Sequence, residues 1–323
     1  MFAVYAAEPS PDDPLSALRL GDRPTPEAPE GWVKVAMRAA SVNMHDLWTL
    51  RGVGIKRESF PMILGCDGAG VLEDGTEVVL HSVISSPDWS GDETLDPGRT
   101  LLTEKHQGTF ADHAIVPKHN VLPKPKDLTF PEAACMGTAW LTAYRMLFVK
   151  SDLRPGQTML VQGASGGVAT ALIQLGKAAG FQVWATGRTE EKRALATTLG
   201  AHATFEPGAR LPTRVDAVFE TVGKATWSHS LKSLKPGGTV VISGATSGDA
   251  TAAELQRIFF LQLRVVGSTM GTKQELADLL QFCALNNLRP QIGQELPLQE
   301  AKTALTSLLN GETAGKIVLT TTT

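Results

Sequence analysis

Residues 161–169, Val161-Gln162-Gly163-Ala164-Ser165-Gly166-Gly167-Val168-Ala169, form the glycine-rich stretch that decides the fold. An apolar, strand-like run at 158–161 precedes it, residues 171–179 behind it have helical spacing, and a second apolar run follows at 182–185. Its core, Ala164-x-Gly166-x-x-Ala169, is a variant of the pattern that opens dinucleotide-binding βαβ units. Small residues let the backbone approach a pyrophosphate, and the next helix offers its N-terminal amides to the anion. This context predicts a dinucleotide site, with a purely structural tight turn as the alternative.

The end of the second apolar run indicates which dinucleotide binds. NAD sites usually carry Asp or Glu about twenty residues beyond the glycines, where it accepts hydrogen bonds from the ribose hydroxyls. Gly187 occupies this position here, and Arg188 follows it. Glycine removes a charge that would repel a 2′-phosphate, and Arg188 can bind that phosphate bidentately, with Lys192 one helical turn on as a second cation. We therefore predict NADPH, the alternative being that both cations are solvated residues that Glu190 and Glu191 satisfy.

The predicted secondary structure changes near residue 130. Residues 1–125 contain short strand-like segments broken by Pro, Gly and Asp, whereas strands and helices alternate from there on, as in βαβ units around a parallel sheet. The tail at 315–320 is strand-like again, so we expect it to return to the first domain. The predicted fold is α/β, with a β-rich domain formed by 1–125 and 286–323 and a doubly wound parallel-sheet domain at 126–285.

The bulk composition excludes several classes of protein. The chain has 323 residues, a formal net charge of -3 and no basic run, which argues against a nucleic-acid or membrane-surface partner. It has no apolar window long enough to span a membrane and no secretory signal at its N-terminus. Its three cysteines, Cys66, Cys135 and Cys283, show no paired spacing, so we expect a reducing cytoplasm.

With these features in place, the chain resembles the medium-chain dehydrogenase/reductase superfamily, and within it the zinc-lacking quinone oxidoreductase-like branch. The resemblance implies a GroES-like catalytic domain, a Rossmann domain inserted before its last segment, and an active site in the cleft between them. It covers nearly the whole chain and is carried, besides the glycine-rich stretch, by Ala40-Ser41-Val42-Asn43-Met44-His45-Asp46, Gly65-Cys66-Asp67-Gly68-Ala69-Gly70, Gly108-Thr109-Phe110-Ala111, Leu141-Thr142-Ala143-Tyr144, Lys235-Pro236-Gly237-Gly238 and Gly315-Lys316-Ile317-Val318.

The resemblance also shows where zinc ligands are replaced. Asn43 stands where zinc-dependent members carry the first zinc cysteine, Cys66 where they carry the zinc histidine, and Thr138 near the third ligand. The four closely spaced cysteines of a structural zinc lobe are missing from a chain with three cysteines in all. We therefore expect no metal, although an improvised site of His45, Cys66 and Asp67 stays open.

Without a Lewis acid, hydrogen bonds alone stabilise the negative charge that develops on a substrate oxygen. Quinones and α,β-unsaturated carbonyls suit such a site because they spread this charge by conjugation. The candidate catalytic residues are Asn43 as hydrogen-bond donor, His45 as proton donor and Asp46, although Asp46 fits better as a structural acid paired with Arg51. The alternative for His45 is a surface or capping histidine.

The sequence therefore predicts an NADPH-dependent quinone oxidoreductase or alkene reductase that acts without zinc. The alternatives are an alcohol or ketone dehydrogenase and an NADPH-binding protein without turnover, and the physiological substrate stays open. The resemblance suggests a homodimer joined through the edge strand near 264–266. We expect the cofactor to contact strand-end turns and the helix start, at Thr142, Ala164, Ser165, Gly166, Gly167, Val168, Gly187, Arg188, Lys192, Thr221, Ser243, Gly244 and Thr269.

Overall fold

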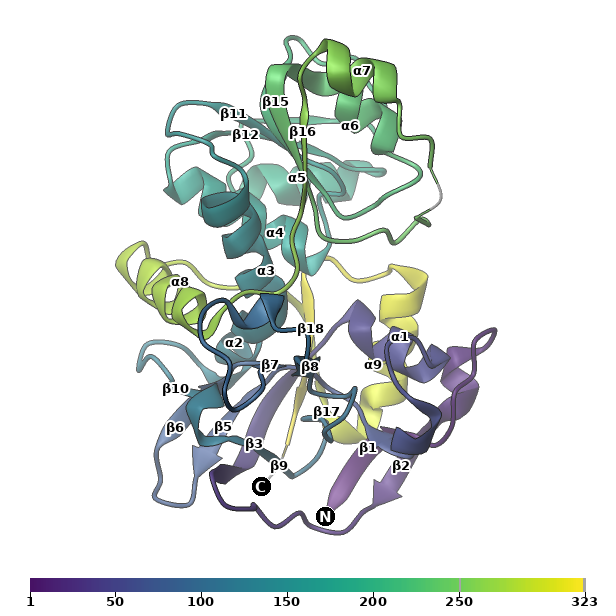
Figure 1. Cartoon of the computed structure of the whole chain (residues 1–323), viewed down its shortest axis with the longest axis vertical. Coiled ribbons are helices and arrows are strands. Elements are labelled where there is room, and N and C mark those ends of the chain that lie inside the picture. Colours follow the sequence, from purple (N-terminus) through teal and green to yellow (C-terminus); the bar gives the residue numbers. More distant parts are fainter. Residues whose placement is uncertain (250, 322–323) are drawn as a thin grey trace. The chain divides into compact units, whose positions relative to one another are not determined.

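The computed structural model describes residues 1–249 and 251–321. The chain forms two compact units, one comprising Met1–Leu141 and Gly271–Thr323 and the other Thr142–Met270. Most of their helices and strands are labelled in Figure 1.

The first unit is built mainly from strands. Its larger sheet has the order β10-β6-β5-β3-β18-β17, with β9 paired to β3, and a smaller sheet has the order β2-β1-β4. The strands are β1 (Phe2–Ala6), β2 (Leu18–Asp22), β3 (Trp32–Val42), β4 (Met62–Ile63), β5 (Ala69–Leu72), β6 (Glu77–Leu80), β7 (Val83–Ile84), β8 (Thr100–Leu101), β9 (His113–Pro117), β10 (Val121–Pro123), β17 (Ile292–Pro297) and β18 (Lys316–Thr320).

The long strand β3 is the centre of this sheet. It pairs antiparallel with β9 and β5 along its first part and with β18 along its last part. Val35 and Met37 pack into one apolar cluster, while Ala40 and Val42 pack into another. β3 thus contributes buried positions to both clusters, and β18 confirms that the tail returns to this unit.

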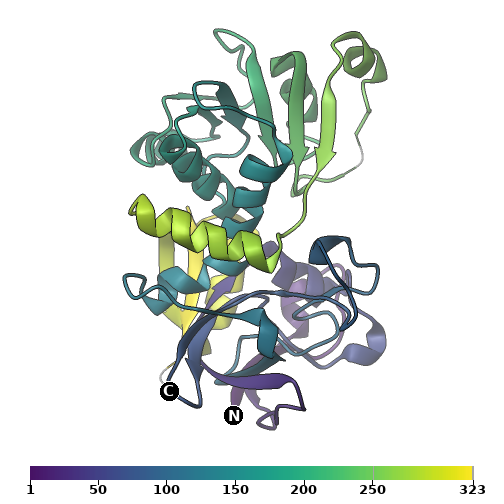
Figure 2. The ribbon, with the colours of Figure 1, turned by 60° about the vertical axis from the view of Figure 1, so that its left-hand side comes forward.

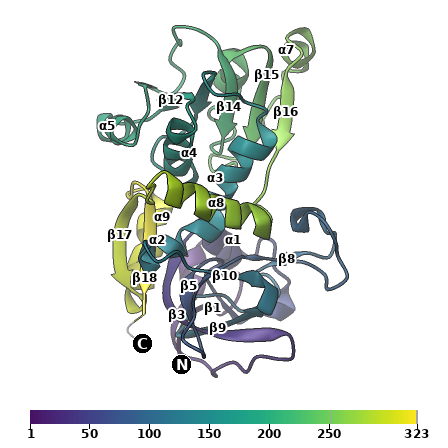
Figure 3. The same ribbon diagram turned by 90° about the vertical axis from the view of Figure 1, so that its left-hand side faces the viewer.

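Helices cover parts of the first unit. The amphipathic helix α9 has its buried residues, Ala301, Ala304 and Leu305, spaced on one face, where they join the same cluster as Ala40 and Val42. Figure 3 shows α9 beside β17 and β18. The other elements here are α1 (Met44–Arg51), α2 (Phe130–Ala134), a π-helix (Met136–Trp140), α8 (Lys273–Leu285) and α9 (Ala301–Asn310).

The second unit is a parallel sheet with helices between its strands. The strand order is β13-β12-β11-β14-β15-β16, and every pairing is parallel. This order belongs to doubly wound dinucleotide folds, so the predicted fold class is confirmed. Figure 2 shows β16, in light green, at the outer edge. The elements are α3 (Leu141–Tyr144), a π-helix (Arg145–Lys150), β11 (Thr158–Val161), α4 (Gly167–Ala178), β12 (Gln182–Thr186), α5 (Glu190–Thr198), β13 (Ala203–Phe205), β14 (Val215–Glu220), α6 (Trp227–Ser233), β15 (Leu234–Ile242), α7 (Leu255–Phe260) and β16 (Arg264–Gly267).

The limits of the compact units differ from the domain limits expected from the sequence. We expected 126–285 to form one domain, but α2 and α8 lie in the first unit. The start of α8 is held there by a hydrogen bond between His81 Nε2 and Gly271 O at 2.9 Å, and the backbone N–H of Lys273 donates to Glu93 Oε1 at 3.4 Å. A helical pattern predicts a helix but says nothing about which sheet it packs against, so the domain limits at 126 and 285 stay a prediction.

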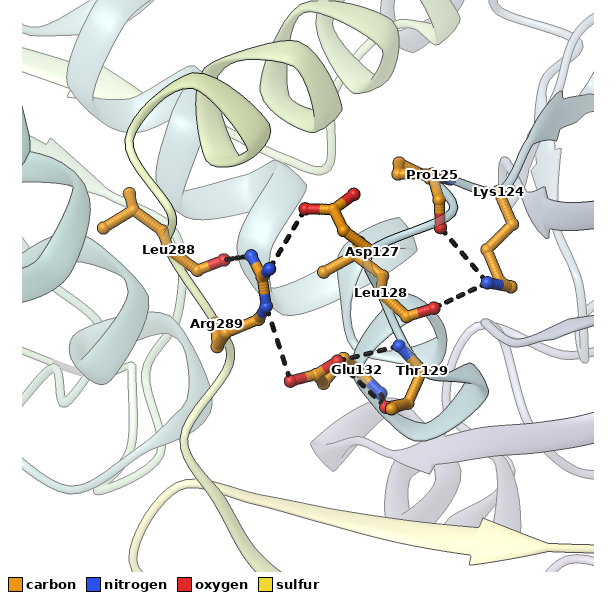
Figure 4. A network of polar contacts seen from close by, with 8 residues as sticks. All are labelled: Lys124, Pro125, Asp127, Leu128, Thr129, Glu132, Leu288 and Arg289. Carbon is orange, nitrogen blue, oxygen red and sulfur yellow. Dashed lines mark hydrogen bonds and ion pairs between the residues drawn. The ribbon is translucent and has the colours of Figure 1, made fainter.

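An ion-pair network joins the chain after α8 to the segment that leads into α2 (Figure 4). Arg289 Nη2 lies 3.0 Å from Asp127 Oδ2, and its Nε lies 3.7 Å from Glu132 Oε1. Glu132 Oε2 also accepts the backbone N–H of Thr129 at 2.8 Å, which completes the N-terminal capping box of α2. Lys124 Nζ donates to the carbonyl of Leu128 at 2.5 Å. The network thus fixes both ends of the segment before α2.

Candidate functional site

The glycine-rich turn connects β11 to α4 in the second unit. Gly163 has a φ of +80°, in the left-handed region, and its N–H donates to Thr186 Oγ1 at 3.2 Å. The N–H of Ala164 donates to Thr186 O at 2.7 Å, so the turn is fixed against the end of β12. A Cβ built on Gly166 would meet no atom within 4 Å, and no side chain of the described residues caps α4. An open backbone therefore leads into an uncapped helix start, the arrangement that binds phosphate groups.

The two residues that decided the cofactor prediction lie beside this turn. Gly187 is buried, and a Cβ built on it would lie 3.5 Å from Ala164 Cβ. Arg188 is exposed and precedes Thr189, the N-cap of α5. The structure thus brings the turn, Gly187 and Arg188 together. The backbone N–H of Lys192 donates to Thr189 Oγ1 at 3.4 Å, which places Lys192 in the first turn of α5.

Arg193 is a residue that the sequence analysis missed. Its Nη2 pairs with Glu190 Oε2 at 2.9 Å, and its Nη1 donates to Gly187 O at 2.8 Å. Glu190 therefore pairs with Arg193 rather than with Arg188, so one of the two glutamates proposed to neutralise Arg188 is engaged elsewhere. The i,i+3 spacing of Glu190 and Arg193 on a helix was the available signal.

A buried polar network lies behind the turn. Gln162 Oε1 accepts a hydrogen bond from Thr186 Oγ1 at 2.7 Å, and its Nε2 lies 3.0 Å from Ser230 Oγ. Ser230 Oγ donates to Glu220 Oε2 at 2.6 Å, and Glu220 is fully buried. The ends of β11, β12 and β14 are thereby joined by side chains, and the sequence analysis assigned a role to none of these four residues.

Glu220 also shapes the turn that follows β14. Its Oε1 accepts the backbone N–H groups of Val222 at 2.8 Å and Gly223 at 3.0 Å, and Thr226 Oγ1 donates to the same oxygen at 2.9 Å. A carboxylate that accepts this many hydrogen bonds holds the backbone of the turn in one conformation.

Most predicted strand-end residues share the carboxyl edge of this sheet. Thr221 follows β14, and Ser243 and Gly244 follow β15; a Cβ built on Gly244 would lie 3.2 Å from Thr221 O. Thr269 is exposed shortly after β16. Thr142 is buried in α3. The first four therefore lie where parallel sheets bind ligands.

A second polar cluster lies in the first unit. Asn43 Nδ2 lies 3.6 Å from Cys66 Sγ, and Cys66 Sγ lies 3.4 Å from Thr138 Oγ1. Asn43 Nδ2 also donates to the carbonyl of Ser41 at 3.0 Å. The three positions that the resemblance equated with zinc ligands therefore converge in this chain, although their side chains come from three separate segments.

Lys316 adds a positive charge to this cluster. It opens β18, is 3 % exposed, and its Nζ donates to Val42 O at 2.8 Å and to Asn43 Oδ1 at 2.6 Å. Burial raises the pKa of the Asp67 carboxyl, and the neighbouring Lys316 charge opposes that rise. From the sequence, Lys316 was recognisable only as part of the resemblance and had no expected role.

Comparisons with known proteins agree with both units. Residues 29–126 match the family model described as alcohol dehydrogenase GroES-like domain, and residues 167–284 match the model described as zinc-binding dehydrogenase. A solved structure described as an NAD-dependent alcohol dehydrogenase is 32% identical, with a TM-score of 0.92 over 99% of both chains. The chain belongs to the medium-chain dehydrogenase/reductase superfamily. It is therefore an oxidoreductase of the medium-chain type.

Curated relatives within the superfamily act on different substrates. A quinone oxidoreductase from Lama guanicoe is 29% identical and covers 92% of this chain and 90% of its own. A crotonyl-CoA reductase from Streptomyces collinus is 27% identical and covers 98% of this chain and 84% of its own.

The improvised metal site of the sequence analysis is not assembled. Cys66 Sγ meets Asn43 and Thr138, Asp67 Oδ1 accepts from Ser41 Oγ at 2.8 Å, and the ring of His45 bonds the backbone of Leu102. Among the residues described, His, Cys, Asp and Glu side chains form no group of three that could hold a metal ion. The described helices also include none long and apolar enough to cross a membrane.

We expected Asp46 to pair with Arg51, but its carboxylate binds other partners. Its Oδ2 accepts the backbone N–H of Asn43 at 2.8 Å, and its Oδ1 accepts that of Gly65 at 2.9 Å. Both carboxylate oxygens thus accept backbone amides at the start of α1 and before Cys66, which satisfies this buried side chain without Arg51. Asp46 therefore holds two backbone segments together, consistent with a structural acid rather than a catalytic one.

His45 is half-buried at the start of α1. Burial lowers the pKa of its imidazole, while the Glu104 carboxylate and a hydrogen bond that the ring donates to the backbone of Leu102 oppose this shift. Its Nε2 is buried and has no hydrogen-bond partner among the described residues. The lowered pKa favours the neutral imidazole at pH 7. The predicted role of His45 as proton donor stays a prediction.

Replacing Asp46 with Asn should change how stability depends on pH. Burial raises the pKa of the Asp46 carboxyl from 3.8 to about 7, so the folded state binds a proton that the unfolded state releases. Stability contributed by this proton is complete below pH 3.8 and is lost as pH rises through about 7. The wild type should therefore lose more stability across this window than Asp46→Asn, as measured by urea unfolding at several pH values. Parallel curves for the two proteins would contradict the assignment.

Proposed function

We propose that this oxidoreductase uses NADPH to reduce a quinone or an α,β-unsaturated carbonyl and needs no zinc ion for the reaction. The observation that carries the proposal is the Asn43–Cys66–Thr138 cluster with Lys316 beside it, where zinc-dependent relatives carry their metal ligands. An amide, a thiol, a hydroxyl and an ammonium group offer hydrogen bonds and one fixed positive charge in place of a Lewis acid. Such a site favours acceptors that delocalise negative charge.

The residues at the glycine-rich turn fit NADPH. Gly166 and the uncapped start of α4 can hold the pyrophosphate, and the buried Gly187 leaves no carboxylate to repel a 2′-phosphate beside the exposed Arg188. When bound, the nicotinamide supplies the hydride. The strand-end residues Thr221 and Ser243 are placed to contact the remaining part of the cofactor.

The names of two relatives support a conjugated substrate. The quinone oxidoreductase and the crotonyl-CoA reductase are 29% and 27% identical to this chain, and both names describe reduction of a conjugated system. A second candidate function, oxidation of an alcohol with NAD, is favoured by the solved alcohol dehydrogenase at 32% identity. The two candidates differ in both cofactor and substrate, so one set of assays separates them.

Purified protein assayed with NADPH and a panel of quinones, enones and enoyl-CoA thioesters should consume NADPH with at least one of these classes. Activity should persist after dialysis against a chelator, because the proposed site depends on side chains rather than on a metal. Alcohol oxidation with NAD that the chelator abolishes would instead establish the second candidate. Tight NADPH binding without turnover on either panel would contradict both.

Replacing Arg188 with Ala should weaken NADPH binding about 10- to 100-fold, because a charged hydrogen-bonding partner of the 2′-phosphate is removed. NADH binding should change by less than about threefold, since NADH has no such phosphate. Arg154→Ala is the matched control, because Arg154 is an exposed arginine at the opposite, amino end of β11. Fluorescence titration with both cofactors measures the effect. Equal losses for NADPH and NADH would remove the 2′-phosphate assignment.

We also propose that the protein forms a homodimer through β16 and α7. The strand β16 ends the parallel sheet, and Val265 on it is 43% exposed. The short helix α7 lies next to it (Figure 3). This helix exposes Leu255, Phe259 and Phe260, and Phe260 is 78% exposed. An unpaired edge beside exposed aromatic side chains suits an isologous contact with a second copy.

The variant Phe260→Asp should shift the protein from dimer to monomer in light scattering coupled to size exclusion, because a carboxylate would be buried at the two-fold contact. Leu285→Asp is the matched control, since Leu285 at the end of α8 is equally exposed at 78% but lies in the other unit. A monomeric wild type, or dissociation by the control alone, would refute this interface.

A further inference from the structure

Lys316 is an unusual residue to find inside the first unit. It is 3% exposed, yet it carries an ammonium group, and removing such a charge from water is unfavourable unless it is paired and hydrogen-bonded. The strand register explains how it comes to be there: β18 runs antiparallel to β3 and pairs Ile317 with Val42, so Lys316 arrives beside Asn43. Its direct hydrogen bonds are to neutral oxygens, Val42 O and Asn43 Oδ1.

This contact determines which way the Asn43 amide faces. An ammonium group can only donate hydrogen bonds, so the amide atom that faces it at 2.6 Å has to be the carbonyl oxygen. The amide nitrogen then faces the opposite way, toward the carbonyl of Ser41 at 3.0 Å and Cys66 Sγ at 3.6 Å. Lys316 therefore sets the direction of both Asn43 N–H bonds.

The same contact makes those N–H groups stronger donors. A positive charge on the oxygen side of an amide draws electron density away from its nitrogen. In a buried, low-dielectric setting this polarisation is screened less than in water. Of the two N–H bonds, the one toward Cys66 is the weaker, because it is long and a thiol sulfur is a poor acceptor. A carbonyl oxygen that gains negative charge is a much better acceptor and would take over this N–H.

We propose that Lys316 is a positioning residue for the reduction, and that it orients and polarises the Asn43 amide so that one amide N–H stabilises the negative charge developing on the substrate oxygen. This inference rests on the proposed function. It adds a residue that acts through Asn43 and does not itself touch the substrate.

Two acidic side chains, Asp46 and Asp67, lie near the Lys316 ammonium group and feel its charge. Asp67 Oδ1 accepts from Ser41 Oγ at 2.8 Å, whereas its Oδ2 is buried without a hydrogen-bond partner among the described residues. Removing the lysine charge would leave these carboxylates without a nearby cation. A variant of Lys316 would therefore lose stability as well as catalytic function, so the two effects have to be measured separately.

A double-mutant cycle tests the role. Asn43→Ala should lower kcat about 100-fold, the loss seen when one preorganised hydrogen-bond donor is removed, and Lys316→Met should lower it about tenfold or more. The double variant should be no more than about twofold slower than Asn43→Ala, because Lys316 acts through the amide that is already gone. The dissociation constant for NADPH, measured by fluorescence, should stay within about twofold in all three, since the proposed cofactor residues of the second unit are intact.

If the loss of kcat in the double variant equals the product of the two single losses, the proposal is overturned. A large loss of NADPH affinity in Lys316→Met would also overturn it. The variant Lys316→Met/Asp67→Asn covers the case in which Lys316→Met does not fold. It should recover most of the unfolding temperature, because the uncompensated carboxylate is also gone, while kcat stays low. Recovery of both stability and kcat would make the role of Lys316 merely structural.

Lys124→Met is the matched control, because the Lys124 side chain is a second buried lysine of the first unit, 5% exposed, and lies in the network of Figure 4. It should lower the unfolding temperature and leave kcat unchanged. A wild-type protein that turns over no conjugated acceptor would instead remove the proposed function, and this role with it, whereas an active wild type with multiplying losses removes the role alone.

Discussion

The antiparallel pairing of β18 with β3 is the contact on which the first unit depends. It joins the end of the chain to a strand near its beginning, with Thr320 opposite Ala39 and Ile317 opposite Val42. Because side chains alternate between the two faces of a strand, a shift of one residue in this register would reverse every side chain of β18. The register therefore decides both that Ile317 and Leu319 enter the apolar cluster and that Lys316 reaches Asn43.

The second unit is arranged by a different constraint, the common carboxyl edge of its parallel strands. The glycine-rich turn, Gly187 and the turn after β14 meet there because parallel strands end together. Side chains then make this edge rigid: Thr186 bonds the turn, Gln162 bonds Thr186, and Ser230 links Gln162 to Glu220. At this edge the backbone of the glycine-rich turn is thus left uncovered by side chains at Gly166. The buried side chains behind the turn form a connected network of hydrogen bonds.

Much of this could be predicted from local patterns. The turn, the alternation of strands and helices, the β-rich first domain and the return of the tail follow from spacing within short windows. The roles of Lys316 and Glu220 could not be predicted in this way, because each depends on a partner brought near by folding or on a backbone conformation. For Arg193 the spacing predicts the pair with Glu190, but not the hydrogen bond to Gly187 O. Asp46 was assigned the wrong partner for the same reason: Arg51 is near in sequence, but the amide of Gly65 is near in space.

The charge at the Asn43 cluster bears on the type of substrate. A metal ion bonds a substrate oxygen directly and can stabilise a localised alkoxide, whereas an ammonium group that acts through an amide delivers only part of its charge. This weaker stabilisation suffices when conjugation already spreads the negative charge over several atoms. The buried Lys316 and the proposed preference for quinones or unsaturated carbonyls would then be two consequences of one arrangement. A site that works without a Lewis acid needs a fixed cation, and it needs an acceptor that spreads its own negative charge.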